Sequence, residues 1–149
     1  MILNQQRAVR LARRPLEHFL RRLQRELGFQ ESGVTIALVS DAEIARMNET
    51  FRKKKGPTDV LSFPAAVRRR PGSMPRATSK QKAGELLGDI AIAPATARRY
   101  ARKHGRTLPA ELRVLILHGV LHLMGYDHET DRGEMERVER KLRKRFGLA

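Results

Sequence analysis

Three of the five histidines lie within one stretch, which reads His118-Gly-Val-Leu-His122-Leu-Met-Gly125-Tyr-Asp127-His128. If the first part of this stretch is helical, His118 and His122 lie four residues apart on one face, where they can bind a single metal ion. Gly125 then provides the left-handed turn that ends a helix, and the chain can return His128 as a third nitrogen ligand. Three protein nitrogens and one open position are typical of catalytic zinc sites, whereas structural zinc sites are closed by four protein ligands.

The same spacing occurs in metzincin proteases, whose pattern H-E-x-x-H-x-x-G-x-x-H differs from this stretch at one position. In those proteases a glutamate follows the first histidine, and its carboxylate acts as the general base for peptide hydrolysis. Gly119 stands at that position here and supplies no carboxylate. The stretch therefore keeps the metal-binding spacing without the base of a protease. A metalloprotease stays as an alternative on the strength of the spacing.

Composition limits the classes of protein to which the chain can belong. Its 149 residues suffice for one domain with its own core. The absence of cysteine excludes disulfides, thiolate metal ligands and cysteine nucleophiles, and it agrees with a reducing compartment. No segment approaches the roughly 20 apolar residues that a membrane-spanning helix needs. We therefore expect a single-domain cytoplasmic protein that does not associate with membranes.

The charge of the chain favours a polyanionic partner. Lys and Arg number 31 against 16 Asp and Glu, so the formal net charge is +15. Such an excess concentrates nucleic acid at the protein surface. The few aromatic residues mostly occupy positions expected in the core, so we expect contact through phosphates and no platform for base stacking. Residues 67–82 are rich in Lys and Arg and contain no acid, which predicts a flexible basic loop that either contacts a phosphate backbone or is a tolerated insertion.

Hydrophobic periodicity predicts the elements that position the histidines. Alternation of apolar residues predicts strands over residues 34–39, 59–63 and 88–93. Helical spacing predicts helices over residues 15–27, 95–104 and 109–124, a short helix after the capping pair Ser40 and Glu43, and a last helix from Asp131. The inner face of the short helix is expected to carry Ile44, Met47 and Phe51. The helix over residues 109–124 is apolar on nearly every side, so we expect the metal-binding helix to be buried centrally.

Three stretches together resemble the signatures of one known family. Residues 48–64 contain Arg52 and the sequence Pro-Thr-Asp-Val-Leu-Ser-Phe-Pro, residues 87–90 read Leu-Gly-Asp-Ile, and the histidine stretch follows. These resemble the YbeY family of metal-dependent endoribonucleases, and the matches span residues 34–135. The resemblance implies an α+β fold in which a small mixed β-sheet is flanked by helices. It also implies a zinc ion, or another divalent transition metal, held by His118, His122 and His128.

The resemblance further implies an activity and partners. The family cleaves single-stranded RNA, processes the 3′ end of small-subunit ribosomal RNA and takes part in ribosome quality control. The arginine linked to activity in that family matches Arg52, whose planar donors would offset charge at the scissile phosphate. Lys53, Lys54 and Lys55 would hold the neighbouring RNA backbone, although the family usually has an acidic residue at this point. Whether a ribosomal protein or an assembly GTPase delivers the small ribosomal subunit stays open.

Two questions about the chemistry stay open at the level of sequence. Asp127 could orient a histidine or accept a proton, but no general base is evident, so attack by water and attack by the RNA 2′-hydroxyl are both possible routes. The metal could also brace the fold alone. In that case the protein would be a non-catalytic RNA-binding factor in ribosome assembly.

Overall fold

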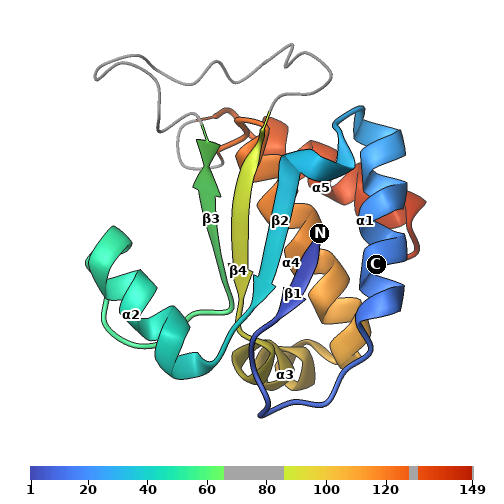
Figure 1. The fold of residues 1–149 in the computed structure, drawn as a ribbon. Helices are drawn as coiled ribbons and strands as arrows, with labels where there is room; N and C mark the ends of the chain where they lie inside the picture. The colour runs from blue at the N-terminus through green and yellow to red at the C-terminus, as the bar shows by residue number, and fades with distance from the viewer. Residues whose placement is uncertain (66–85, 128–130, 149) are drawn as a thin grey trace.

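A computed structural model describes residues 1–65, 86–127 and 131–148, apart from the side chain of Glu31. The predicted basic loop over residues 67–82 and the predicted ligand His128 lie outside these residues. The described chain forms a small mixed sheet flanked by helices, which confirms the expected α+β fold (Figure 1). In the described ranges no helix combines the length and the apolar character needed to cross a membrane.

The sheet has four strands in the order β1-β2-β4-β3. β1 (Ile2–Asn4), β2 (Val34–Leu38) and β4 (Gly88–Ile92) are parallel, and β3 (Val60–Pro64) is an edge strand that runs antiparallel to β4. The three predicted strands are confirmed within one residue at each end. β1 was not predicted, because three residues are too short for an alternating pattern. β1 is a strand because it pairs with β2, and not because of a pattern in its own sequence.

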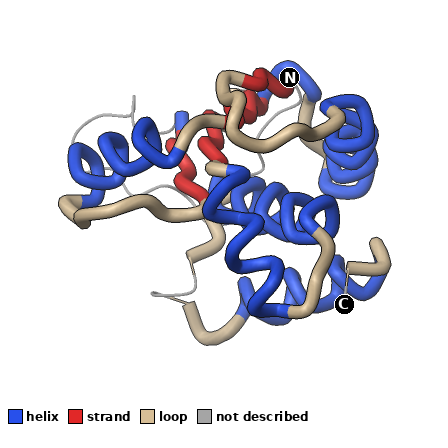
Figure 2. The backbone as a smooth tube through the Cα atoms, turned by 90° about the horizontal axis from the view of Figure 1, so that it is seen from below, coloured by secondary structure: helices blue, strands red, loops and turns tan. Residues whose placement is uncertain are grey.

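Five helices surround the sheet. They are α1 (Arg13–Leu27), α2 (Asp41–Arg52), α3 (Pro94–His104), α4 (Leu108–Leu123) and α5 (Glu134–Arg145), and a short 3-10 turn (Glu31–Gly33) precedes β2. α4 and α1 cover one face of the sheet, α5 packs against α4, and α2 lies on the other face (Figures 1 and 2). α4 is the most buried helix, as its apolar sequence predicts.

The main core lies between the sheet and α4. Ile36 and Ile90 of the sheet pack there with Leu117 and Leu121 of α4, and all four side chains are almost fully buried. Val60 of the edge strand also faces this core. A smaller cluster on the opposite face lies under α2 and contains Val39, Ile44, Leu61, Ala91 and Ala93. The two clusters show that α4 covers its face of the sheet closely and that α2 covers less of the other.

The start of α5 differs from the prediction. The capping pair of Asp131 and Glu134 suggested a helix from Asp131, but α5 begins at Glu134 after Gly133, which has a φ of 91°. The Asp131 carboxylate accepts hydrogen bonds from the backbone N–H groups of Gly133 and Met135, at 2.8 Å each. Asp131 therefore organises a turn in front of the helix. Because Met135 is the second residue of α5, the same carboxylate also satisfies one of the backbone donors at the start of the helix.

Gly88 sets how closely β3, β4 and the end of α4 approach one another. Its φ is 141°, a conformation that side chains with a Cβ rarely adopt. A Cβ atom there would lie 2.3 Å from the Phe63 carbonyl oxygen and 3.0 Å from the Leu123 side chain. Leu123 follows the candidate ligand His122 directly. The second sequence signature thus fixes where the histidine-bearing end of α4 meets the sheet.

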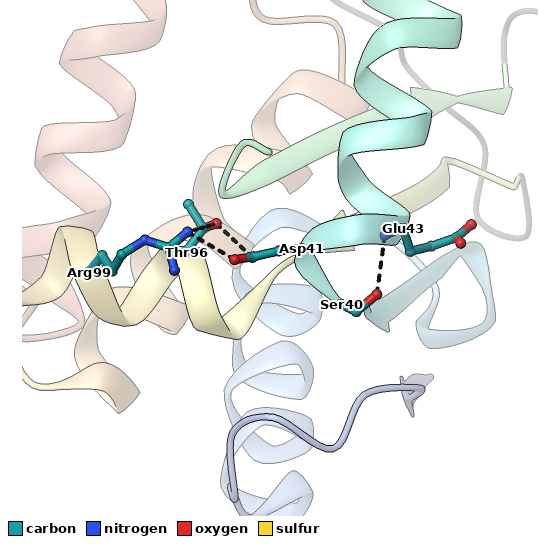
Figure 3. A network of polar contacts seen from close by, with 5 residues as sticks. All are labelled: Ser40, Asp41, Glu43, Thr96 and Arg99. Atoms are coloured by element: carbon teal, nitrogen blue, oxygen red, sulfur yellow. Dashed lines mark hydrogen bonds and ion pairs between the residues drawn. The ribbon is translucent and has the colours of Figure 1, made fainter. Parts of the chain in front are cut away.

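A polar network joins the beginnings of α2 and α3 (Figure 3). The Ser40 hydroxyl accepts from the Glu43 backbone N–H at 3.1 Å, which confirms the predicted cap. The Asp41 carboxylate accepts from the Thr96 hydroxyl at 2.7 Å and from Arg99 at 2.9 Å. Burial raises the pKa of Asp41, but the hydrogen bonds from Thr96 and Arg99 and the charge of Arg99 outweigh it. The pKa therefore lies below its ordinary value.

This lowered pKa makes the contribution of Asp41 to stability dependent on pH. Because the folded state favours the ionised carboxylate, its stabilisation is present above the unfolded pKa of about 3.9 and is lost as pH falls through the folded value. We expect Asp41→Asn to lower the free energy of unfolding near neutral pH and to matter less with increasing acidity. Urea unfolding at about pH 7 and about pH 3 measures this. Glu43→Gln, on the same helical turn, is the control, and an equal loss at both pH values for Asp41→Asn would contradict the prediction.

Candidate functional site

His118 and His122 come together on α4 as the sequence predicts. Their Nε2 atoms lie 3.1 Å apart. The ring centroids are 4.6 Å apart and the ring planes are nearly perpendicular, at 77°. Both side chains are half-buried near the C-terminal end of the helix. The two Nε2 atoms therefore lie within reach of a single ion, and neither ring is fully buried among the described residues.

The separation of these nitrogens fits a shared metal ion. Zinc binds histidine nitrogens at about 2.0–2.1 Å with tetrahedral geometry, which puts two ligand nitrogens roughly 3.3 Å apart. The observed 3.1 Å is close to that value. Imidazole nitrogens suit zinc and other divalent transition metals and are poor ligands for calcium or magnesium. The donors present therefore fit the metal that the sequence implies.

Glu139 of α5 supports the first of the two histidines. Its carboxylate accepts a hydrogen bond from His118 Nδ1 at 3.2 Å, and its side chain is only 17% exposed. With the proton held on Nδ1, Nε2 is the nitrogen whose lone pair a metal would bind. Burial raises the pKa of Glu139, but the hydrogen bond and charge of His118, with the charges of Arg143 and His122, outweigh it. The pKa lies below its ordinary value, so the carboxylate stays ionised.

The sequence analysis missed Glu139. A signal for it exists, because Glu139 lies four residues after Met135 and three before Leu142, both of which face the core. A carboxylate within the apolar stripe of a helix needs a buried partner. The sequence does not tell which element supplies that partner, since His118 is 21 residues away.

The chain turns after His122 as predicted. α4 ends at Leu123, and Gly125 has a φ of 100°. The Gly125 N–H donates to the His122 carbonyl at 3.0 Å, and the Tyr126 N–H donates to the Leu121 carbonyl at 3.1 Å. This pair of bonds is the Schellman motif that terminates many helices. It directs the chain away from the helix axis immediately before Asp127.

The third metal ligand and Asp127 stay predictions. Asp127 is half-buried and is the last residue before the gap in the described chain, and its carbonyl accepts from the Asp131 N–H at 3.0 Å. His128 is not among the described residues. Within the described ranges no group of three His, Asp or Glu side chains is arranged to hold a metal ion. The structure thus places two candidate ligands together and does not test the third.

Gly119 has a packing role. A Cβ atom there would lie 2.8 Å from Ile90 Cδ1 and 3.1 Å from Ile90 Cγ2, inside the core between α4 and β4. Its carbonyl accepts from the Ser62 hydroxyl of β3 at 3.4 Å. A glutamate at this position would point into Ile90 and would bury a carboxylate among apolar side chains. Position 119 therefore lacks the glutamate of the proteases, and the packing of Ile90 against it disfavours a glutamate there.

The basic segment that follows α2 has a fixed backbone and open side chains. Lys53 has a φ of 55°, and its N–H donates to the Glu49 carbonyl at 3.1 Å. The buried Asn48 side chain donates to the Gly56 carbonyl at 3.0 Å and holds the end of the turn. The side chains of Arg52, Lys53, Lys54 and Lys55 are exposed and make no ion pair with any described residue. These four residues are called the basic turn below.

The structure does not bring Arg52 into contact with the histidines. Arg52 is the last residue of α2, which packs on one face of the sheet, whereas His118 and His122 belong to α4 on the other face. The edge strand β3 lies beside both, since Ser62 contacts Gly119 and Phe63 contacts Phe51. The basic turn leads directly into β3. The two groups of candidate residues therefore flank one edge of the sheet.

Known proteins are similar in sequence to this chain over most of its length. A family model described as Endoribonuclease YbeY matches residues 1–147. The chain is 43% identical to the Endoribonuclease YbeY of Solibacter usitatus over 143 residues, which cover 95% of this chain and 85% of that protein. It is 40% identical to the Endoribonuclease YbeY of Koribacter versatilis over 148 residues, which cover 99% and 86%.

A solved structure shares the fold. The solution structure of TM1509 from Thermotoga maritima matches with a TM-score of 0.61 and 28% sequence identity, and the match covers 99% of this chain and 90% of that one. The family match over nearly the whole chain and the identity of at least 40% to these two relatives confirm the resemblance drawn from the three sequence signatures. The chain belongs to the YbeY family of endoribonucleases.

Proposed function

We propose that this protein is a metal-dependent endoribonuclease that cuts single-stranded RNA, matures the 3′ end of small-subunit ribosomal RNA and serves ribosome quality control. The observation that carries the proposal is the convergence of His118 Nε2 and His122 Nε2, with Glu139 on the far nitrogen of His118, in a chain of this family. The net charge of +15 supports a polyanionic substrate. The small ribosomal subunit, presented by a ribosomal protein or an assembly GTPase, is the proposed partner.

The residues that would hold the metal are His118, His122 and His128. A zinc ion, or another divalent transition metal, supplies Lewis-acid polarisation of a phosphoryl oxygen and lowers the pKa of water to about 7. Glu139 keeps the proton of His118 on Nδ1 and fixes the ring plane. Asp127 would give the same support to His128, because it directly precedes it. The chain then contributes a rigid site on a buried helix.

Substrate contacts come from the basic turn. Arg52 would donate to the non-bridging oxygens of the scissile phosphate and offset the charge that grows there in the transition state. Lys53, Lys54 and Lys55 would bind phosphates on either side. None of these four side chains is committed to an ion pair among the described residues, so no contact has to break when RNA binds. The basic turn would have to approach the histidines around the β3 edge when the substrate is in place.

The test incubates metal-loaded protein with precursor ribosomal RNA and maps the products. Specific cleavage near the mature 3′ end is expected. A 2′,3′-cyclic phosphate on the product would indicate attack by the RNA 2′-hydroxyl, and a 5′-phosphate would indicate attack by water. If the protein binds RNA but never cuts it, the alternative hypothesis of a non-catalytic assembly factor is supported instead. Casein cleavage that disappears in His122→Ala would revive the protease alternative, which Gly119 opposes.

Removing the support of His118 should weaken metal binding. We expect Glu139→Ala to lower the affinity for zinc by about 10- to 100-fold, because the imidazole loses its orienting acceptor. Glu139→Gln keeps an acceptor without the charge, so its effect should be smaller. Competition with a chromophoric chelator measures the affinity directly, without reference to activity. The matched control is Glu136→Gln, an exposed carboxylate on the same helix that pairs with Arg140. Equal affinities for Glu139→Ala and the control would contradict the assigned role.

A further inference from the structure

Phe51 is exposed, although the sequence placed it on the inner face of its helix. Ile44 of α2 is fully buried and Met47 is half-buried, but Phe51, one turn further along, is 66% exposed. The reason is the shape of the sheet. β3 is the edge strand, and the last turn of α2 extends outward past it (Figures 1 and 2). An apolar ring in this place has no core to enter.

The Phe51 ring is nevertheless held in position. It makes an edge-to-face contact with Phe63 of β3, with ring centroids 5.2 Å apart and planes at 74°. Phe63 is half-buried and belongs to the small cluster under α2. One part of the Phe51 ring is therefore anchored, and about two thirds of the side chain stays open to solvent. A fixed, open aromatic ring loses little freedom when a flat ligand stacks on it.

The surroundings of Phe51 identify the kind of ligand. The next four residues are the basic turn, whose cations make no ion pair within the described chain. Asn48 fixes the backbone of this turn through the Gly56 carbonyl, so the cations stay next to the ring. Proteins that bind single-stranded nucleic acid combine a stacking aromatic ring with cations that follow the backbone. A run of unpaired cations favours RNA over an apolar protein surface as the occupant.

We propose, against the expectation from composition, that Phe51, braced by Phe63, is a stacking subsite for one unpaired base of the RNA, whose flanking phosphates bind Lys53, Lys54 and Lys55 of the basic turn. The inference rests on the RNA substrate of the proposed function and needs neither the metal nor the cleavage step. Side chains alternate along β3, so Ser62 faces α4 and its histidines while Phe63 faces α2. The stacked base thus lies on the α2 side of β3 and does not contact the histidines, and Arg52 is left for the scissile phosphate. Loss of the ring should raise KM and leave kcat nearly unchanged.

Binding to two single-stranded probes, one with bases and one without, distinguishes base stacking from charge attraction. We expect Phe51→Leu to weaken binding of a short oligoadenylate by about 5- to 100-fold and to leave unchanged the binding of an abasic ribose-phosphate strand of equal length. Phe51→Tyr should bind both like the original protein. Lys54→Ala should weaken both strands and lower the salt dependence of binding, because one phosphate contact is lost. Fluorescence anisotropy gives the affinities, and a gel after each titration confirms that the strands are intact.

A spectroscopic readout reports stacking itself. The chain contains no tryptophan, so Phe51→Trp introduces a single indole at the subsite. Its fluorescence should be quenched by oligoadenylate and not by the abasic strand. The matched control is Tyr100, an exposed aromatic residue on α3 that stacks on His104 and lies near Lys103. Tyr100→Trp should show no base-dependent quenching, and Tyr100→Leu should bind RNA normally.

The outcomes separate this inference from the nuclease proposal. Unchanged oligoadenylate affinity in Phe51→Leu would overturn the subsite, whether or not the protein cuts RNA. Equal losses on the intact and abasic strands would also overturn it, since the ring would then act only through the fold or the charges. No RNA binding by the original protein would overturn both proposals. A base-dependent loss in a protein that never cuts RNA would sustain the subsite and refute the nuclease. A change only in self-association, measured by sedimentation, would make the ring a protein contact and overturn the subsite.

Discussion

His122→Ala should lower the rate of ribosomal RNA cleavage by about 10³-fold or more. In the proposed three-nitrogen site, loss of one ligand would release or distort the metal, and the several kcal/mol that the metal would contribute to the transition state would be lost. The side chain is half-buried at the end of α4, so the helix and its core contacts should survive its removal. The rate of cleavage and the zinc content per protein, measured by elemental analysis, should fall together.

Two variants act as references for this result. His104→Ala removes a histidine of α3 that is 49% exposed and pairs with Glu111, and it should keep both metal and activity. His118→Ala should behave like His122→Ala, because the two Nε2 atoms face the same point. If His118→Ala lowers only thermal stability while ribosomal RNA binding persists and the original protein never cuts, the metal is structural. Equal cutting by the original protein and both variants would indicate a contaminating nuclease.

Arg52→Ala should reduce kcat by about 10²- to 10³-fold, the typical cost of losing one preorganised donor to a developing negative charge. Arg52→Lys should recover only part of the rate, because a single ammonium does not reproduce the planar, bidentate donors of arginine. The side chain is exposed and makes no ion pair within the described residues, so the free energy of unfolding should change by less than about 0.5 kcal/mol. Single-turnover kinetics on precursor RNA separate the chemical step from binding.

The matched control for Arg52 is another exposed arginine of α2. Arg46 pairs with Glu43 and lies a turn and a half earlier on the same helix, so Arg46→Ala removes equal charge without touching the basic turn. It should change cleavage only slightly. If Arg52→Ala raises KM at constant kcat, Arg52 binds RNA and takes no part in the transition state. If Arg46→Ala loses as much activity as Arg52→Ala, the effect is one of net charge.

Elements set by local patterns were predictable from the sequence. The strands near residues 34, 60 and 88 and the helices α1, α3 and α4 lie within two residues of the predicted bounds, and α2 begins directly after the predicted cap. Ser40 caps α2 and Gly125 ends α4 as expected, because a cap depends on neighbouring backbone groups alone. Burial of α4 also followed from its apolar sequence. Asp131 is an exception, since α5 begins three residues later, although the Asp131 carboxylate accepts one N–H from the first turn of that helix, that of Met135.

In the candidate site, too, local patterns predicted some features and the tertiary structure decided the others. Four-residue spacing on a helix brings His118 and His122 together, and the distance between their nitrogens confirms that part of the prediction. The capping pair predicted the start of α2 but not that Arg52 would be its last residue. No local pattern shows that α2 and α4 lie on opposite faces of the sheet. Because of this arrangement, Arg52 and the histidines are separated by the edge strand β3.

The sequence by itself determined the pair of ring nitrogens, the turn that follows them, the positive charge and the family, because each depends on residues near one another in the chain. Tertiary structure alone decided that Glu139 supports His118, that Gly88 and Gly119 let the sheet and α4 approach closely, and that Phe51 is exposed. These features depend on which distant elements pack together and on where the sheet ends. Packing is a property of the whole fold, and helical or strand periodicity carries no information about which surface a face will meet.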